Sequence, residues 1–158
     1  MSEMISKYLS YEDYQCHHCK KTPFPLFTEY RTALFEAFDN IVESLKIKVI
    51  VTSGWRCEEH QEELRKAGYK AAMFSPHFFS AIDFLPDPKS GVSVSEVVKF
   101  IEENYPKMRL GYRAYNYRFI HMDNVYNVPE EDLNKLLDKY PFEVKEHVKR
   151  AWRPGVTW

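Results

Sequence analysis

The sequence predicts one α+β domain in which a few short strands pack against helices. Two observations lead to this fold class. Apolar residues recur at three- and four-residue steps in several segments, as they do on the buried face of a helix. Short β-branched runs lie between these segments, but strands and helices do not alternate regularly, which argues against a doubly wound parallel sheet. The 158 residues suit a single domain, 1–158, and no repeat or long linker divides them.

The first half of the chain begins with an irregular region, which we expect to be followed by a helix, a strand and a second helix. Residues 1–23 are polar and end near two prolines. Thr28 to about Leu45 carries one apolar helical stripe, and the β-branched run from Lys48 to Thr52 is typical of a buried strand. Glu58 to Ala67 is charged and favours a helix, for which Gly68 is a suitable stop.

The second half of the chain contains three more expected strands and three more expected helices. One helix begins at Ser93, because Glu96 follows three residues later as in a capping box. The expected strands are Ala81 to Leu85, Met108 to Tyr112 and Tyr117 to Met122, and the other two helices are Pro129 to Asp138 and Phe142 to Trp152.

Charge and hydropathy exclude several classes of partner. The 22 basic and 23 acidic residues leave a net charge of -1, whereas nucleic acid or an anionic membrane would favour a basic face. No apolar run reaches the roughly 18 residues of a membrane span. Residues 1–15 have no apolar run and do not resemble a signal peptide. We therefore expect a protein that is cytoplasmic as synthesised, binds neither nucleic acid nor membrane, and is a monomer.

The cysteines and a nearby histidine form a possible structural metal site. Three cysteines do not suit a disulfide framework, and an apolar fraction of 44% allows a core without one. Two short-spaced pairs together give a Cys3His set able to bind one zinc ion. The set is Cys16, Cys19, Cys57 and His60. His17 and His18 are alternative fourth ligands, and the simpler interpretation is that these residues bind no metal.

Three other short segments carry residue types suited to a catalytic zinc ion. They are Ser53 to Cys57 (Ser-Gly-Trp-Arg-Cys), Ser75 to Asp83, and Phe119 to Asp123 (Phe-Ile-His-Met-Asp). Such a zinc needs about three His or carboxylate ligands and one open position. Arg56, at a turn after a strand, is suited to bind a substrate carboxylate through two parallel hydrogen bonds. Taken singly, a His beside Phe residues is more often a packing residue, and an Asp at a strand end more often caps a turn.

The order of these segments resembles the zinc D-alanyl-D-alanine carboxypeptidase family, which includes phage endolysin peptidases and shares its fold with the hedgehog signalling domain. Tyr8 to Cys16 and Leu110-Gly111-Tyr112 are similar to the phage-like branch, so the resemblance covers about residues 8 to 125. It implies a small antiparallel sheet packed with helices. It also implies a zinc-dependent hydrolase that cleaves peptide bonds in bacterial peptidoglycan, and that would reach the cell wall by lysis or a separate export route.

Carried over by position, the resemblance implies a role for six residues. The zinc ligands would be His77, Asp83 and His121. Arg56 and Ser75 would bind substrate, with Arg56 also acting in catalysis. Asp123 would orient a ligand or shuttle a proton.

The chain departs from the family pattern in two places that bear on activity. The spacing from His77 to Asp83 is one residue shorter than in the family, and a residue lost inside the strand would turn the carboxylate to the wrong face. Arg118 stands where some members have an acidic general base, and an arginine cannot accept a proton. Two other interpretations therefore stay open: a zinc-binding module of the same fold without catalysis, and a domain with structural histidines and no metal.

Overall fold

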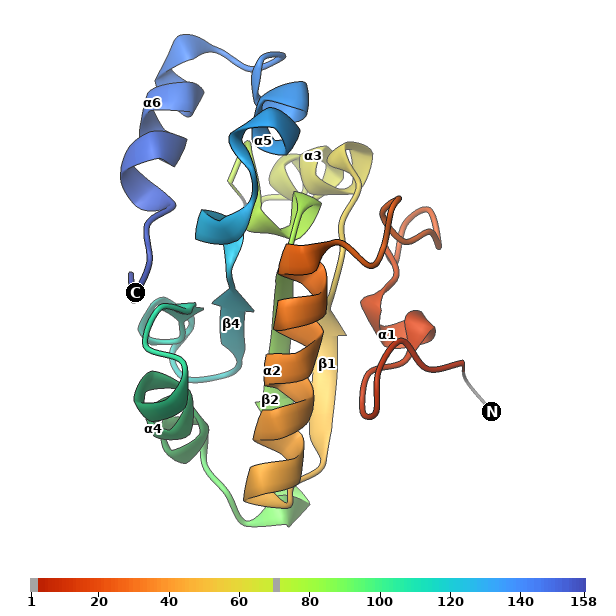
Figure 1. Ribbon diagram of the computed structural model, residues 1–158, viewed down its shortest axis with the longest axis vertical. Coiled ribbons are helices and arrows are strands. Elements are labelled where there is room, and N and C mark those ends of the chain that lie inside the picture. The colour runs from red at the N-terminus through yellow and green to blue at the C-terminus, as the bar shows by residue number, and fades with distance from the viewer. Residues whose placement is uncertain (1–2, 70–71) are drawn as a thin grey trace.

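The computed structural model describes residues 3–69 and 72–158 and has an α+β fold, which confirms the predicted fold class. The described strands form one sheet in the order β1-β2-β4-β3, and each neighbouring pair is antiparallel. Figure 1 labels β1, β2 and β4 of this sheet. The strands are β1 (Val49–Ser53), β2 (Ala81–Pro86), β3 (Arg109–Gly111) and β4 (Ile120–Asp123). The small antiparallel sheet expected from the sequence is therefore present, in a chain where helices supply most of the regular structure.

Six α-helices accompany the sheet in the described part of the chain. They are α1 (Tyr11–Tyr14), α2 (Glu29–Leu45), α3 (Glu58–Lys66), α4 (Val94–Asn104), α5 (Glu130–Leu137) and α6 (Phe142–Ala151). The long helix α2 begins after Thr28, whose hydroxyl accepts a hydrogen bond from the Arg31 amide, and it buries the predicted apolar stripe. α4 begins after Ser93, which caps the Glu96 amide as the sequence predicts. None of the described helices is long and apolar enough to cross a membrane.

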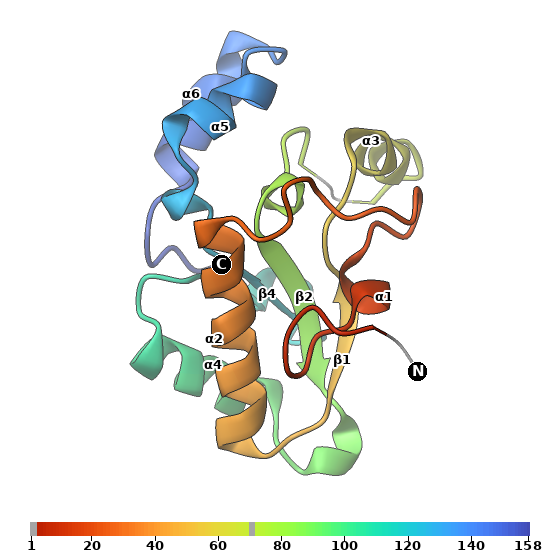
Figure 2. The ribbon, with the colours of Figure 1, turned by 45° about the vertical axis from the view of Figure 1, so that its right-hand side comes forward.

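Strand alternation divides the sheet into an apolar and a polar face. Ile82 and Phe84 of β2 join a core cluster with side chains of α2 and α4, and these helices cover that face (Figures 1 and 2). Because successive side chains on a strand point to opposite faces, Asp83 and His121 lie on the other face. Register pairs these two residues across β2 and β4, so the polar face brings them together.

A second apolar cluster fixes the loop that precedes β2. Phe74, Phe78 and Phe79 of this loop pack with buried residues of α5 and α6. The Phe74 ring stacks on Trp152 with ring centroids 5.3 Å apart. The C-terminal helices therefore hold the short 3-10 helix η1 (Pro76–Phe78) against one end of the sheet.

Two predicted features differ from the structure. The N-terminal region predicted to be irregular contains α1, which forms because Ser10 caps the Asp13 amide. The strand predicted from Tyr117 begins only at Ile120, because Asn116 and Tyr117 have positive φ angles of 56° and 59° and extend the preceding turn. The other expected elements are confirmed to within about two residues at each end.

The N-terminal segment packs against the turn that follows β1 (Figure 2). The Trp55 amide donates to the Tyr14 carbonyl at 2.7 Å. Gly54 lies so close to this segment that a Cβ atom there would be 2.4 Å from the Tyr14 carbonyl oxygen. A glycine is therefore required at position 54 for the two segments to approach.

We expect Gly54→Ala to lower the free energy of unfolding by about 1–3 kcal/mol, because a backbone atom rather than a flexible side chain must move. Chemical denaturation measures the change. Gly111→Ala is the matched control, since the three atoms nearest to the added methyl group belong to the Trp158 side chain and not to the backbone, and it should cost less. Equal stability of Gly54→Ala and the unchanged protein would contradict the close packing of Tyr14.

Candidate metal centre

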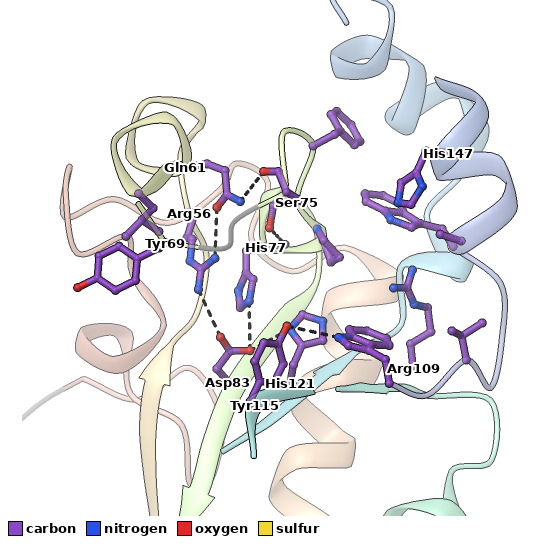
Figure 3. Close-up of a pocket in the computed structure, with 18 of the residues that line it drawn as sticks. Arg56, Gln61, Tyr69, Ser75, His77, Asp83, Arg109, Tyr115, His121 and His147 are labelled. Atoms are coloured by element: carbon purple, nitrogen blue, oxygen red, sulfur yellow. Dashed lines mark hydrogen bonds and ion pairs between the residues drawn. The ribbon is translucent and has the colours of Figure 1, made fainter. Parts of the chain in front are cut away.

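Three side chains with metal-binding atoms converge at one end of the polar face of the sheet (Figure 3). His77 comes from η1, Asp83 from β2 and His121 from β4. The Asp83 Oδ1 atom is 3.2 Å from His77 Nε2 and 2.9 Å from His121 Nδ1. Ligand atoms in a tetrahedral zinc site are about 3.3 Å apart, so these separations and donor types fit such an ion. The three residues that the resemblance implied as ligands could thus bind one metal ion.

The shortened spacing from His77 to Asp83 does not prevent this convergence. β2 begins at Ala81 and keeps its register with β4, so a residue missing relative to the family pattern would have to be missing from the turn before the strand. Ser80 in this turn donates a hydrogen bond to the Asn124 side chain, and Asn124 in turn donates to the Tyr30 carbonyl at 2.8 Å. These bonds hold the turn before β2 in place. Asp83 therefore lies on the same face of the sheet as His121.

Hydrogen bonding leaves the His77 ring ready to bind a metal. Its Nδ1 lies 2.7 Å from the Gly54 carbonyl oxygen, which can only accept, so Nδ1 carries the proton. The unprotonated Nε2 then faces Asp83. Burial, together with the nearby Arg56 charge, lowers the pKa of His77 and keeps the ring neutral. Metal-binding histidines in proteins commonly donate their other ring N–H to a backbone carbonyl in this way, which fixes the ring orientation.

His121 lies between two carboxylates. Its Nδ1 faces Asp83, and its Nε2 donates to Asp123 Oδ2 at 2.6 Å. Burial opposes the charged ring, but the two carboxylates outweigh it and raise the pKa of His121 to about 9. Burial likewise raises the pKa of Asp83, and the neighbouring imidazoles lower it by more, so Asp83 stays ionised.

Asp123 acts on the site through His121. The residue is fully buried, and its Oδ1 accepts from the Val125 amide at 3.3 Å. Arg109 Nε lies 3.5 Å from the same oxygen. Asp123 does not line the cavity beside the cluster. Of the two roles implied by the sequence, its contacts support the orienting one.

A cavity of about 690 Å³ opens beside the three candidate ligands, all of which line it. Arg56 also lines this cavity, as the sequence predicts. Its guanidinium donates to Ser53 Oγ at 2.9 Å. It also donates to Gln61 Oε1 and Asp83 Oδ2 at 3.2 and 3.3 Å (Figure 3). Arg56 therefore holds the Asp83 carboxylate in place, and a substrate carboxylate would have to share these donors.

Ser75 also lines the cavity, but its hydroxyl has a local partner. Ser75 Oγ accepts from the His77 amide at 3.1 Å and caps η1. Its contact therefore orients the His77 loop.

The cavity residues that were not predicted from the sequence include Arg109, Tyr115 and Trp158. Arg109 Nε and Nη1 are buried without a hydrogen-bond partner among the described residues, and the guanidinium lies 5.0 Å from the Trp158 ring. The Tyr115 hydroxyl accepts from Trp158 Nε1 at 3.4 Å. Arg109 interrupts an apolar strand, which was a usable signal. The sequence carries no comparable signal for Tyr115, which lies in a turn, or for Trp158, which comes from a distant segment of the chain.

The cysteines predicted to bind a second metal also come together. One atom from each of Cys16, Cys19 and Cys57 lies within 4.8 Å of the others. His60 Nδ1 is 3.5 Å from Cys16 Sγ, and His18 Nδ1 is 3.9 Å from Cys57 Sγ. Although burial raises the pKa of the Cys16 thiol, surrounding backbone N–H groups lower it by more. This second cluster could also bind a metal ion.

Comparison of the chain with family models, curated proteins and solved structures finds no match. The function is therefore inferred from the geometry of the two clusters and the cavity.

In protein stripped of metal by a chelator, we expect His121 to keep its proton up to a pH of about 9. Asp123→Asn should lower this pKa, because it removes one of the two carboxylates that stabilise the protonated ring. An NMR titration of the imidazole measures both values. Asp13→Asn, at an exposed position in α1, is the matched control and should leave the titration unchanged. An unchanged His121 pKa in Asp123→Asn would contradict the orienting contact.

Proposed function

We propose that this protein is a zinc-dependent peptidase that hydrolyses peptide bonds in bacterial cell-wall peptides, of D,D-carboxypeptidase or endopeptidase type. The observation that carries the proposal is the His77–Asp83–His121 cluster, which lines a cavity beside a guanidinium group. The cavity of about 690 Å³ is within the size range of small-molecule and peptide sites. The order of the three motifs, which resembles that of the zinc D-alanyl-D-alanine carboxypeptidases, supports the same conclusion.

His77 Nε2, Asp83 and His121 Nδ1 would hold the zinc ion. When bound there, zinc would supply Lewis acidity that polarises a scissile carbonyl and activates water. Arg56 keeps Asp83 oriented through Oδ2 and leaves Oδ1 toward the two imidazoles. The protein's own residues thus fix the ligands before substrate binds, which is the arrangement that catalysis requires.

Two further cavity residues have the chemistry to bind substrate. Arg109 lines the cavity as a cation, its Nε and Nη1 are buried without a hydrogen-bond partner among the described residues, and its ion pair with Asp123 is long at 3.5 Å, so it would attract a substrate carboxylate. The Tyr115 hydroxyl lies in the same cavity and accepts one hydrogen bond, which leaves its proton free to donate to charge that develops on a carbonyl oxygen. A carboxylate-bearing peptide fits this pairing of a cation with a phenol.

A zinc-binding module without catalysis is the second candidate function. Among the described lining residues, Asp83 is the single carboxylate, so no further acidic side chain is available as a general base. Arg118 is exposed and does not line the cavity.

His147 of α6, in contrast, favours the catalytic function. It lines the cavity, and histidine is the residue type that most often transfers protons in enzymes. Turnover of cell-wall peptides distinguishes the two functions.

We expect His77→Ala and Asp83→Ala each to lose one equivalent of zinc, because each change removes one of three ligands. Mass spectrometry of the purified, folded variants measures the metal content. His147→Ala is the matched control, since this imidazole lines the cavity outside the cluster and its loss should leave the zinc content unchanged. Full metal retention in Asp83→Ala would overturn the proposed centre.

Purified zinc-loaded protein should hydrolyse peptidoglycan or its D-alanyl-D-alanine-ended peptides. We expect Tyr115→Phe to lower kcat by about 100-fold without loss of zinc, because one donor to the developing oxyanion is removed. Release of free amines or of D-alanine measures turnover. Tyr69→Phe, a matched change at another tyrosine of the cavity wall, should have a smaller effect. Zinc binding with no turnover on any cell-wall peptide would favour the binding module instead.

A further inference from the structure

Two separations in the cysteine cluster are those of a metal site and not those of a disulfide. Cys16 Sγ and Cys57 Sγ are 3.6 Å apart, and Cys16 Sγ is 3.5 Å from His60 Nδ1. Bonds of about 2.3 Å from zinc to sulfur separate neighbouring ligand atoms in a tetrahedron by about 3.7 Å. A disulfide would need about 2.05 Å between the two sulfurs. The described cysteines are all free thiols.

Backbone groups already support the sulfur atoms. The Cys57 amide points at Cys16 Sγ at 3.5 Å, and the His60 amide donates to Cys57 Sγ at 3.3 Å. N–H donors of this kind form the second shell that stabilises a metal-bound thiolate. Cys57 is also the N-cap of α3, so Cys57 and His60 are fixed by the same helix end.

From these contacts we propose that Cys16, Cys19, Cys57 and His60 form a second zinc site, which is structural and fixes the turn that carries Arg56. This site does not rest on the proposed peptidase activity. Its ligand set is closed, with four protein ligands and no open position, as in structural zinc sites. It would join the N-terminal segment to the start of α3.

His60 fits the fourth position better than His18. His60 is half-buried and sits in the first turn of α3, three residues after Cys57. His18 is exposed, its Nδ1 is farther from the nearest sulfur, and its Nε2 lies 3.4 Å from Glu63. The His18 ring stacks beside His60 with centroids 6.0 Å apart.

The second site would orient the first because one turn connects them. The turn from Ser53 to Cys57 is held by the N-terminal segment through the bond from Trp55 to the Tyr14 carbonyl. On its other side, the Gly54 carbonyl accepts from His77 Nδ1, and the Arg56 amide donates to the His77 carbonyl at 3.1 Å. A metal ion that fixes Cys57 thus fixes the backbone on which the His77 ring depends.

The test is metal content and cobalt spectroscopy on the full chain. The unchanged protein should hold two equivalents of zinc, and Cys19→Ser and His60→Ala should each hold one. Cobalt(II) substitution should give thiolate-to-metal charge-transfer bands, which the His77–Asp83–His121 centre cannot produce because it has no sulfur ligand. In Cys19→Ser, zinc affinity at that first centre should fall about tenfold, the size of effect typical for second-shell changes.

His17→Ala and His18→Ala are the matched controls and should keep both equivalents and the charge-transfer bands. His77→Ala should lose one equivalent and keep those bands, which distinguishes failure of the first centre from failure of the second. Absence of charge-transfer bands in the cobalt protein, or a Cys16–Cys57 disulfide in its place, would overturn the second site. Loss of the bands in His18→Ala with retention in His60→Ala would overturn the assignment of His60.

Discussion

The hydrogen bond from the His77 ring to the Gly54 carbonyl joins the parts of the structure on which the candidate centre depends. His77 comes from a loop held by the C-terminal helices, whereas Gly54 belongs to the turn after β1. Neither segment by itself would fix the orientation of the His77 ring, because a histidine in a loop has several rotamers of similar energy. The bond selects one ring orientation and one tautomer. It leaves Nε2 directed at Asp83, which the sheet holds in register with His121.

Charge balance explains how several ionisable groups of the candidate centre can be buried side by side. The Asp83 and Asp123 carboxylates lie in contact with Arg56, Arg109 and His121, so each buried anion has a cationic neighbour. A buried charge without a partner is strongly destabilising. In the metal-free protein the proton on His121 supplies part of this balance. A divalent ion bound at His121 Nδ1 would replace this proton. The same residues would therefore balance their charges both with and without a metal ion.

Much of the fold follows from local signals in the sequence. Thr28 and Ser93 start helices because their hydroxyls cap the first turn, and the stripe on α2 is buried as its spacing predicts. The α1 helix was not predicted, because four residues are too few for a periodic pattern to be recognised. The late start of β4 was also not predicted. Asn116 and Tyr117 have left-handed backbone angles, and the β-favouring residues beside them give no sign of this in the sequence.

The site was harder to predict than the fold because its residues come from distant segments. Periodicity places Asp83 and His121 on strands but does not pair them, and their combination came from the order of motifs. Arg109 and Trp158 meet only because the final residues of the chain run beside β3, with the Trp158 amide donating to the Leu110 carbonyl. Gly111 faces this segment, and a side chain there would occupy the place of the Trp158 ring. Contacts of this kind depend on the complete fold and leave no local pattern.

The two candidate metal clusters differ in the way that their proposed roles would require. The histidine and aspartate ligands face a cavity and are buried among ionisable groups, so an ion there would be available to a ligand from solution. The cysteine cluster lies where the N-terminal segment meets α3, in a part of the chain with one short helix and few other regular backbone bonds. Such a segment gains little from secondary structure, and the binding free energy of a metal ion would offset the conformational entropy that it loses on folding. With a metal ion bound to the cysteines, the turn between the clusters would transmit this rigidity to Arg56 and Gly54, whose contacts hold Asp83 and His77 of the first candidate centre.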